Sequence, residues 1–154
     1  MEIKNISIIN LSGKINKEDS VKIKKDINFM KNKFPTLNFC LLEHTFANPD
    51  PKFLADALNK AIKDDKMDLI MVVKGGVRSI ELINYININV ELKNKKAILG
   101  NSDFCHIAPH LNKINNLEVF IGLNLKSFSK LDKDSIERFE DVILKRKSLN
   151  IREE

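Results

Sequence analysis

Short apolar runs alternate with amphipathic segments along the chain, and this alternation is the feature that most constrains the fold. Five runs are rich in β-branched or large apolar side chains: residues 6–11, 37–42, 69–73, 97–99 and 117–121. Near-continuous apolar strands are typical of parallel sheets covered by helices on both faces. The alternation therefore predicts one three-layer α/β domain over residues 1–154, with a mainly parallel sheet of about five strands, Rossmann-like or flavodoxin-like in type.

The segments between these runs carry helical patterns. One helix face is formed by apolar residues three or four positions apart: Ile23, Ile27, Met30 and Phe34. A second helix is predicted over residues 51–63, because Asp50 suits the N-cap and Pro51 suits the first turn. Its apolar stripe would comprise Phe53, Leu54, Ala57, Leu58, Ala61 and Ile62. Near the C-terminus, Asp134 and Glu137 have the spacing of a capping box.

Charge, hydropathy and cysteine content argue against several classes of protein. Only four of the 26 cations are Arg, and the lysines are scattered among Asp and Glu, so the formal charge of +5 predicts no nucleic-acid partner. No apolar run approaches the roughly 20 residues of a membrane span, and residues 1–5 lack the features of a secretory signal. We expect a cytoplasmic protein without a membrane partner, in which Cys40 and Cys105 are small core residues.

A double glycine follows the third apolar run, at Lys74-Gly75-Gly76. Sites in open α/β sheets form beyond the carboxyl ends of strands, so this strand exit is a candidate. Paired glycines permit positive φ and expose N–H groups to an oxyanion or phosphate. The sequence matches neither a Walker loop nor a dinucleotide-binding fingerprint, and an ordinary glycine turn is the alternative interpretation.

A serine follows the fourth apolar run, within Gly100-Asn101-Ser102-Asp103. A serine on a sharp strand-to-helix turn raises its hydroxyl above the sheet, and the helix N-terminus offers free N–H groups to developing negative charge. The arrangement is typical of a nucleophile elbow with the pattern Gly-x-Ser-x-Gly, except that Phe104 replaces the second glycine. Alternatively, Ser102 or Asp103 caps the next helix.

The two turns together resemble the N-terminal domain of the LD-carboxypeptidases and microcin C immunity peptidases. In that family an Arg-Gly-Gly-type turn is followed, at the same separation, by a Gly-Tyr-Ser-Asp elbow. Further similar segments are residues 8–13, Phe46-Ala47 with the following helix and strand, and residues 119–122 with 135–147. The resemblance spans nearly the whole chain and is most specific from Lys74 to Asp103.

The resemblance implies a cofactor-free serine peptidase that hydrolyses an amide bond in a muropeptide or a peptide–nucleotide antibiotic. Ser102 would be the nucleophile, Gly76 and Asp103 would donate backbone N–H groups to the oxyanion, and Gly75 and Asn101 would contact the substrate. Each oxyanion donor would lower the barrier by about 3–4 kcal/mol in an assembled site.

The family takes the Glu and His of its Ser-Glu-His triad from a C-terminal domain that these residues do not include. The resemblance therefore implies a partner, either a separate C-terminal-domain protein or a second copy of the chain, and no hydrolysis by the chain alone. His44, His106 and His110 are predicted to be surface or structural residues, because Pro109 disturbs the helix that would align two of them. No set of three or four zinc ligands is evident.

Three departures from the family pattern favour a second hypothesis. Asn101 replaces the elbow tyrosine, Cys105 replaces a threonine, and Ile121-Gly122-Leu123 replaces His-Gly-Pro. A non-catalytic binding or interaction module could keep the strand-exit cleft as a site for a small anion or a peptide. A third hypothesis is a flavodoxin-like mononucleotide binder that uses the same two turns.

Overall fold

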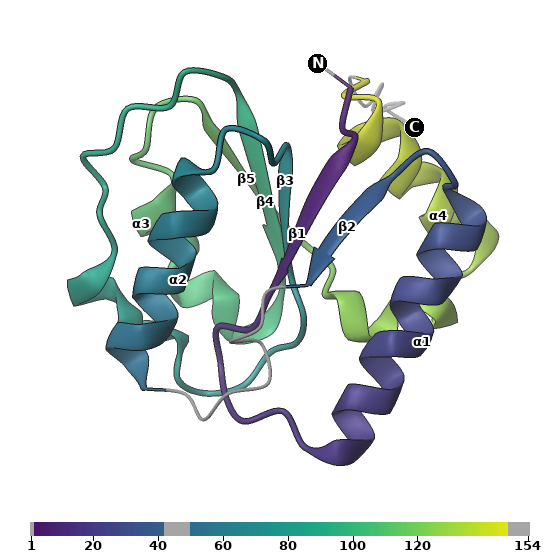
Figure 1. Ribbon diagram of the computed structural model, residues 1–154, viewed down its shortest axis with the longest axis horizontal. Coiled ribbons are helices and arrows are strands. Elements are labelled where there is room, and N and C mark those ends of the chain that lie inside the picture. The colour runs from purple at the N-terminus through teal and green to yellow at the C-terminus, as the bar shows by residue number, and fades with distance from the viewer. Residues whose placement is uncertain (1, 42–49, 148–154) are drawn as a thin grey trace, which may run out of the picture.

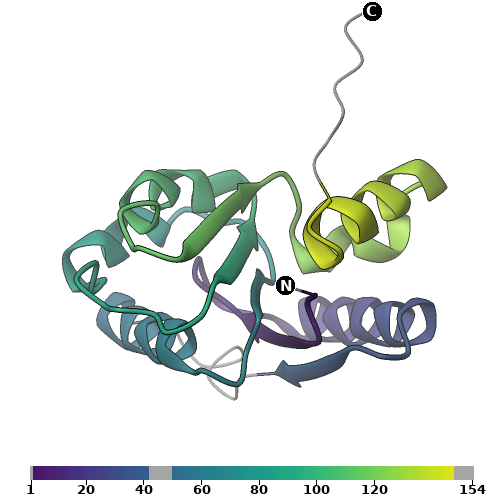
Figure 2. The same cartoon turned by 90° about the horizontal axis from the view of Figure 1, so that it is seen from above.

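The computed structural model describes residues 2–41 and 50–147 (Figure 1). His44 and the Phe46-Ala47 pair named above lie outside the described residues. The described residues form a five-stranded sheet between two layers of helices, which Figure 2 shows from above. The predicted three-layer α/β fold is therefore confirmed.

The sheet is parallel throughout the described residues. Its strands are β1 (Asn5–Ile9), β2 (Asn38–Leu41), β3 (Leu69–Val72), β4 (Lys96–Gly100) and β5 (Leu117–Ile121). They lie in the order β2-β1-β3-β4-β5, and each neighbouring pair runs parallel. This is the flavodoxin-like order, in which the chain direction across the sheet reverses beside β1 and ligands bind beyond the carboxyl ends of the strands.

Helices cover both faces of the sheet (Figure 1). One face carries α1 (Lys17–Lys33), the 3₁₀ helix η4 (Leu125–Lys130), α4 (Lys133–Arg138) and the π-helical segment η5 (Phe139–Leu144). The other face carries α2 (Pro51–Lys63), the 3₁₀ helices η2 (Ser79–Tyr85) and η3 (Ser102–His106), and α3 (Ala108–Leu111). Each layer buries its own apolar cluster against the sheet, and burial of this surface is the main driving force for folding.

The position of a strand in the sheet decides how closely it follows the expected apolar pattern. All residues of β3 and β4 are buried, because both strands have neighbours on each side and helices on each face. Residues of β2 alternate between exposed and half-buried, because this strand lies at the edge. Cys40 on β2 and Cys105 on η3 are both exposed free thiols, so their predicted place in the core is wrong.

Helix α2 has the predicted bounds, and its cap forms as expected. The Lys52 N–H donates to the Asp50 carboxylate at 2.9 Å, and Pro51 occupies the first turn. The stripe differs at Phe53, which is 47% exposed, while Ala55 is fully buried in its place. At the C-terminal helix the cap is also different: the Ser135 N–H donates to Asp132 at 2.7 Å, and Asp134 is exposed in the first turn.

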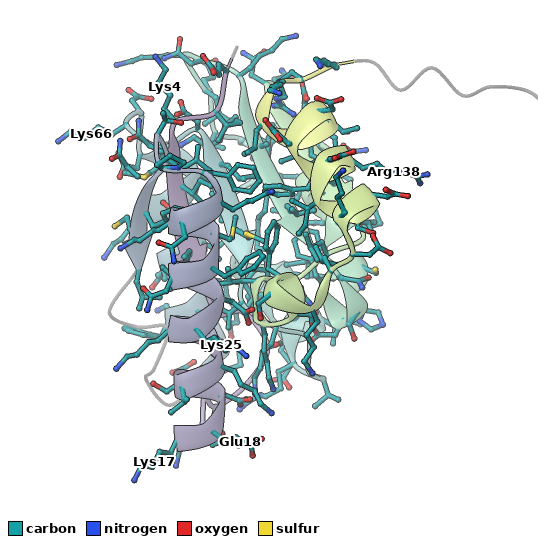
Figure 3. All side chains as sticks on the ribbon, turned by 90° about the vertical axis from the view of Figure 1, so that its right-hand side faces the viewer. Lys4, Lys17, Glu18, Lys25, Lys66 and Arg138 are labelled. Carbon is teal, nitrogen blue, oxygen red and sulfur yellow. The ribbon has the colours of Figure 1, made fainter. Side chains whose placement is uncertain are left out.

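The lysines are spread over the surface. Figure 3 shows Lys4 and Lys66 near one end of the molecule and Lys17 at the opposite end of α1. Among the described residues, no helix combines the length and the apolar character that crossing a bilayer requires.

Candidate functional site

Ser102 lies at the first position of η3, directly beyond the carboxyl end of β4. Its backbone has φ 63°, in the left-handed region that residues other than glycine rarely adopt. The side chain is exposed, and its hydroxyl has no hydrogen-bond partner among the described residues. Gly100 permits this tight turn, because a Cβ at that position would lie 2.5 Å from the Phe104 ring.

The double glycine faces Ser102 from the neighbouring strand exit. A Cβ on Gly75 would lie 2.5 Å from the Ser102 Cβ and 2.7 Å from its Oγ. A Cβ on Gly76 would lie 2.5 Å from the backbone oxygen of Ser12. Neither glycine has positive φ, so that part of the predicted reason for the pair is wrong. Glycine is required here because two backbones and a side chain approach one another closely.

The Asp103 carboxylate binds the double-glycine turn and does not cap its own helix. Oδ1 accepts the Gly76 N–H at 3.0 Å, and Oδ2 accepts the N–H groups of Arg78 and Ser79, each at 3.1 Å. The Ser79 hydroxyl also donates to the Asp103 carbonyl oxygen. Asp103 is only 5% exposed, and these bonds satisfy the buried carboxylate. The capping alternative for Asp103 is therefore wrong.

This arrangement bears on the predicted oxyanion donors. The Gly76 N–H is directed at the Asp103 carboxylate, so an oxyanion would have to share it. Within residues 2–41 and 50–147, the N–H groups of Gly75 and Asp103 have no acceptor. The Asp103 N–H is free because it belongs to the first turn of a helix. These two donors flank Ser102. The predicted oxyanion role of Gly76 and Asp103 and the predicted substrate contact of Gly75 stay predictions.

Asn101 is clamped to the exit of β5 through its backbone. Its N–H donates to the Asn124 side-chain oxygen at 2.9 Å, and the Asn124 amide donates back to the Asn101 carbonyl at 3.4 Å. The Gly122 N–H donates to the Gly100 carbonyl at 3.0 Å. The Asn101 side chain is half-buried and has no hydrogen bond among the described residues, so substrate contact stays a prediction.

A second buried carboxylate, Asp19 in the first turn of α1, holds the same turn from the other face of the sheet. Asp19 is 4% exposed and bridges the ammonium groups of Lys74, at 2.8 Å, and Lys126. Burial alone would raise the pKa of Asp19, but hydrogen bonds and charges from Lys126 and Lys74 outweigh it and lower the pKa to about 2. Sequence reasoning missed Asp19, since its position predicts only a favourable charge at a helix N-terminus.

No described residue forms a hydrogen bond with the Ser102 hydroxyl, and this includes the two described histidines. The His106 ring nitrogen Nδ1 lies 3.0 Å from the Asp103 carbonyl oxygen, which directs the ring into its own helix turn. His110 lies beyond a break at Ile107, where η3 ends and α3 begins. No three His, Cys, Asp or Glu side chains among the described residues come together as a metal ion would need.

An apolar pocket of about 550 Å³ lies between β5 and the helical layer of α4 and η5. Its wall includes Gly122 and Leu123, which follow β5, together with Phe139 and Val142. Ser102 and the double glycine are not part of it. The candidate site is therefore the open edge of the sheet at the two turns, and the pocket is a separate feature.

One family model and several solved structures are similar to this chain. A family model described as the LD-carboxypeptidase N-terminal domain matches residues 6–122. Comparison with curated proteins gave no match. The residues that carry the predicted site therefore lie inside the matched range.

Several solved structures match most of this chain, but the match covers less than half of each of those proteins. The MccF-like protein from Streptococcus pneumoniae, in complex with AMP, is 26% identical with a TM-score of 0.77, over 92% of this chain and 45% of that one. The microcin C7 self-immunity protein MccF, in its wild-type apo state, is 18% identical with a TM-score of 0.79, over 97% and 46%. An MccF-like protein from Bacillus anthracis is 18% identical with a TM-score of 0.67, over 86% and 41%. The chain spans less than half the length of these proteins.

Proposed function

Because the chain belongs to the LD-carboxypeptidase N-terminal domain family, we propose that it supplies the serine half of a serine peptidase active site. Ser102 is the nucleophile in this proposal. The observation that carries it is the φ of 63° at Ser102, on a strand-to-helix turn that exposes the side chain beside Gly75. A strained serine at such a turn is typical of a nucleophile elbow.

The reaction is amide hydrolysis through an acyl-enzyme. The Ser102 oxygen forms a bond to the amide carbonyl carbon, and its proton passes to a base. The base returns that proton to the leaving amine as the C–N bond breaks, which leaves an ester on Ser102. Water then attacks the ester, gives a proton to the base, and releases the carboxylate and the restored hydroxyl. The N–H groups of Gly75 and Asp103 stabilise the developing oxyanion.

The base of this proposal lies outside the described residues. One observation supports this step: the Ser102 hydroxyl has no hydrogen-bond partner among the described residues. We propose a separate C-terminal-domain protein that carries the Glu and His as the partner, with a second copy of this chain as the alternative source.

The proposed substrate is a small peptide with an amide bond next to a polar group, such as a muropeptide or a peptide–nucleotide conjugate. One similar structure is a complex with AMP and another a complex with aspartyl sulfamoyl adenosine, and these ligands favour the nucleotide conjugate. Asn101 lies beside Ser102 with an uncommitted side-chain amide, which suits it to contact such a polar group. We place this reaction in the cytoplasm.

Labelling with a serine-directed fluorophosphonate tests the nucleophile. Wild-type chain and Ser102→Ala are incubated with the probe, alone and with a separately expressed C-terminal domain that carries the Glu and His. We expect no hydrolysis of muropeptide or peptidyl-nucleotide by the chain alone. With the partner domain, labelling and hydrolysis should appear in the wild type and be absent in Ser102→Ala. Equal hydrolysis by Ser102→Ala would contradict the assignment.

The second candidate is a non-catalytic module that binds a peptide or a small anion at the same sheet edge. The observation that favours it is the His106 ring, which is turned onto the Asp103 carbonyl and away from a role as base. Titration calorimetry with a peptidyl-nucleotide separates the two functions. Binding without hydrolysis or labelling under every partner condition supports the module, whereas stoichiometric labelling of the isolated chain at Ser102 counts against it.

A further inference from the structure

We propose that Ser12 and Asp19 are positioning residues that hold the Gly75 N–H in a fixed direction beside Ser102. The proposal rests on the proposed function, in which this N–H is an oxyanion donor. Neither residue lies in the stretch from Lys74 to Asp103 that carries the most specific resemblance. Ser12 follows β1, and Asp19 belongs to α1.

The unit that they hold is the peptide group between Lys74 and Gly75. Its carbonyl oxygen accepts a hydrogen bond of 2.9 Å from the Ser12 hydroxyl. Its N–H, on Gly75, has no acceptor among the described residues. The carbonyl and the N–H of a trans peptide point in opposite directions, and the described residues include no cis peptide. The Ser12 hydroxyl therefore sets the direction of the Gly75 N–H.

Ser12 is itself held firmly enough to do this. It is 2% exposed, and its N–H donates to the Asn10 side-chain oxygen at 3.3 Å. Its backbone oxygen lies so close to Gly76 that a Cβ there would approach to 2.5 Å. A hydroxyl carried by such a fixed backbone loses little further freedom when it forms its hydrogen bond.

Asp19 holds the same peptide through the Lys74 side chain and the preceding residue. The Lys74 ammonium donates to Asp19 at 2.8 Å and to the Lys14 carbonyl at 3.1 Å. The other Asp19 oxygen binds Lys126, whose own N–H donates to the Val73 carbonyl at 2.9 Å. One carboxylate thus ties the two residues before Gly75 to α1 and η4.

The direction matters because Gly75 is in direct reach of Ser102. The Ser102 Cβ and Oγ pack directly against the Gly75 Cα. A small rotation of the Lys74–Gly75 peptide therefore changes the position of its N–H relative to the Ser102 hydroxyl. Oxyanion donors act through geometry that exists before the reaction begins. Loss of either support would therefore weaken stabilisation of the transition state without removing a substrate contact.

Nuclear magnetic resonance of the full ¹⁵N-labelled chain tests the structural part directly. Ser12→Ala and Asp19→Asn are compared with Ser127→Ala and Glu18→Gln, which change exposed residues of η4 and α1. We expect the Gly75 amide resonance to move in both test variants by more than in either control, while the amides of β3 and β4 keep their positions. A Gly75 resonance that stays at its wild-type position in both test variants overturns the proposal.

Conservative variants separate loss of the bond from loss of the fold. Ser12→Thr keeps a hydroxyl, and Asp19→Glu keeps a carboxylate, so each should return the Gly75 resonance toward the wild-type position. A resonance displaced as far in these variants as in Ser12→Ala and Asp19→Asn would show that the hydroxyl and the carboxylate are not what holds the peptide.

Kinetics test the consequence in the reconstituted enzyme. For Ser12→Ala and Asp19→Asn we expect kcat to fall about 10- to 100-fold with KM unchanged, as for a misdirected transition-state donor. Unchanged kcat with a displaced Gly75 resonance would show that this N–H does not serve the reaction. If Ser102→Ala leaves hydrolysis intact, the proposed function fails, and the resonance data still decide whether Ser12 and Asp19 hold the turn.

Discussion

Two buried aspartates hold the same turn from opposite faces of the sheet, and they use different donors. Asp103 takes three backbone N–H groups from one short segment, those of Gly76, Arg78 and Ser79. Asp19 takes two ammonium groups from separate segments, that of Lys74 after β3 and that of Lys126 in η4. A backbone N–H has its direction fixed by the peptide plane, whereas the two lysine side chains are 20% and 30% exposed and reach water.

Because their donors differ, the two aspartates should contribute differently to the stability of the turn and to its geometry. Removing Asp103 takes a charged acceptor from three peptide N–H groups, of which that of Ser79 is buried, that of Arg78 half-buried and that of Gly76 exposed. The buried Ser79 N–H then carries the penalty of an unsatisfied group. Removing Asp19 frees two long side chains that can be hydrated, which costs less. We expect Asp103 to be required for the double-glycine turn to form. We expect Asp19 to set the direction of the Gly75 N–H within that turn.

The substitution Asp103→Ala should have the largest effect and tests the first half of this comparison. It removes three hydrogen bonds to a charged acceptor, and we expect the free energy of unfolding to fall by about 3–5 kcal/mol. Urea denaturation followed by circular dichroism measures the change. Asp134→Ala, at an exposed aspartate in the first turn of α4, is the matched control. A loss below about 1 kcal/mol would mean that water or a rearranged turn replaces the carboxylate.

The fold could be predicted from the sequence because its determinants are local. The apolar runs located the strands to within a few residues, and Asp50 with Pro51 set the start of α2. The errors concern properties that depend on distant neighbours. Phe53 fits the helical stripe but is 47% exposed, and Cys40 is exposed because β2 is an edge strand.

The candidate site was only partly predictable, for the same reason. Ser102 and Gly75 were found because a glycine or serine at a strand exit is a local signal, strengthened by the family resemblance. The binding of the Asp103 carboxylate to a turn some 24–27 residues away, and the bond from Asp19 to Lys74 across 55 residues, leave no local pattern. Aspartate near a helix start is typical of a cap, and only the packing of two elements shows another role.

The substitution Gly75→Ala tests how firmly Asp103 holds the double-glycine turn, because the added methyl group would clash with Ser102. The added Cβ would lie 2.5 Å from the Ser102 Cβ, while Asp103 holds the following residue in place, so neither side yields easily. We expect a loss of about 3 kcal/mol in the free energy of unfolding, at the upper end of the usual cost of overpacking. Gly13→Ala is the control, because nothing lies within 4 Å of a Cβ there.

The outcome at Gly75 also reports on the nucleophile. If Ser102 moves away to admit the methyl group, fluorophosphonate labelling of the reconstituted enzyme should be lost with Gly75→Ala and kept with Gly13→Ala. A variant of unchanged stability and labelling would show that the β3 and β4 turns are less closely packed than the structure has them, and that Asp103 does not fix their separation.

The smallest effect is expected for Asp19→Asn, and it depends on pH. Because the pKa of Asp19 is lowered from 3.8 to about 2, its charged form stabilises the fold above the unfolded-state value, and this contribution is lost as pH falls through about 2. The contribution amounts to about 2 kcal/mol at neutral pH. The stability difference between wild type and Asp19→Asn should therefore be largest above pH 4 and disappear near pH 2, as measured by urea denaturation across this range.

Glu18→Gln is the control that shows whether the pH-dependent loss of stability is specific to the buried Asp19 carboxylate. Glu18 precedes Asp19 on the first turn of α1, where Figure 3 shows it at the solvent-exposed end of the helix. Its pKa is also lowered, by a hydrogen bond and the charge of Lys22, but both groups are exposed and water replaces their interaction at little cost. Glu18→Gln should follow the wild-type stability curve at every pH. If it shows the same pH-dependent loss as Asp19→Asn, the general charge of the α1 N-terminus explains the effect, and the bridge between the two lysines does not.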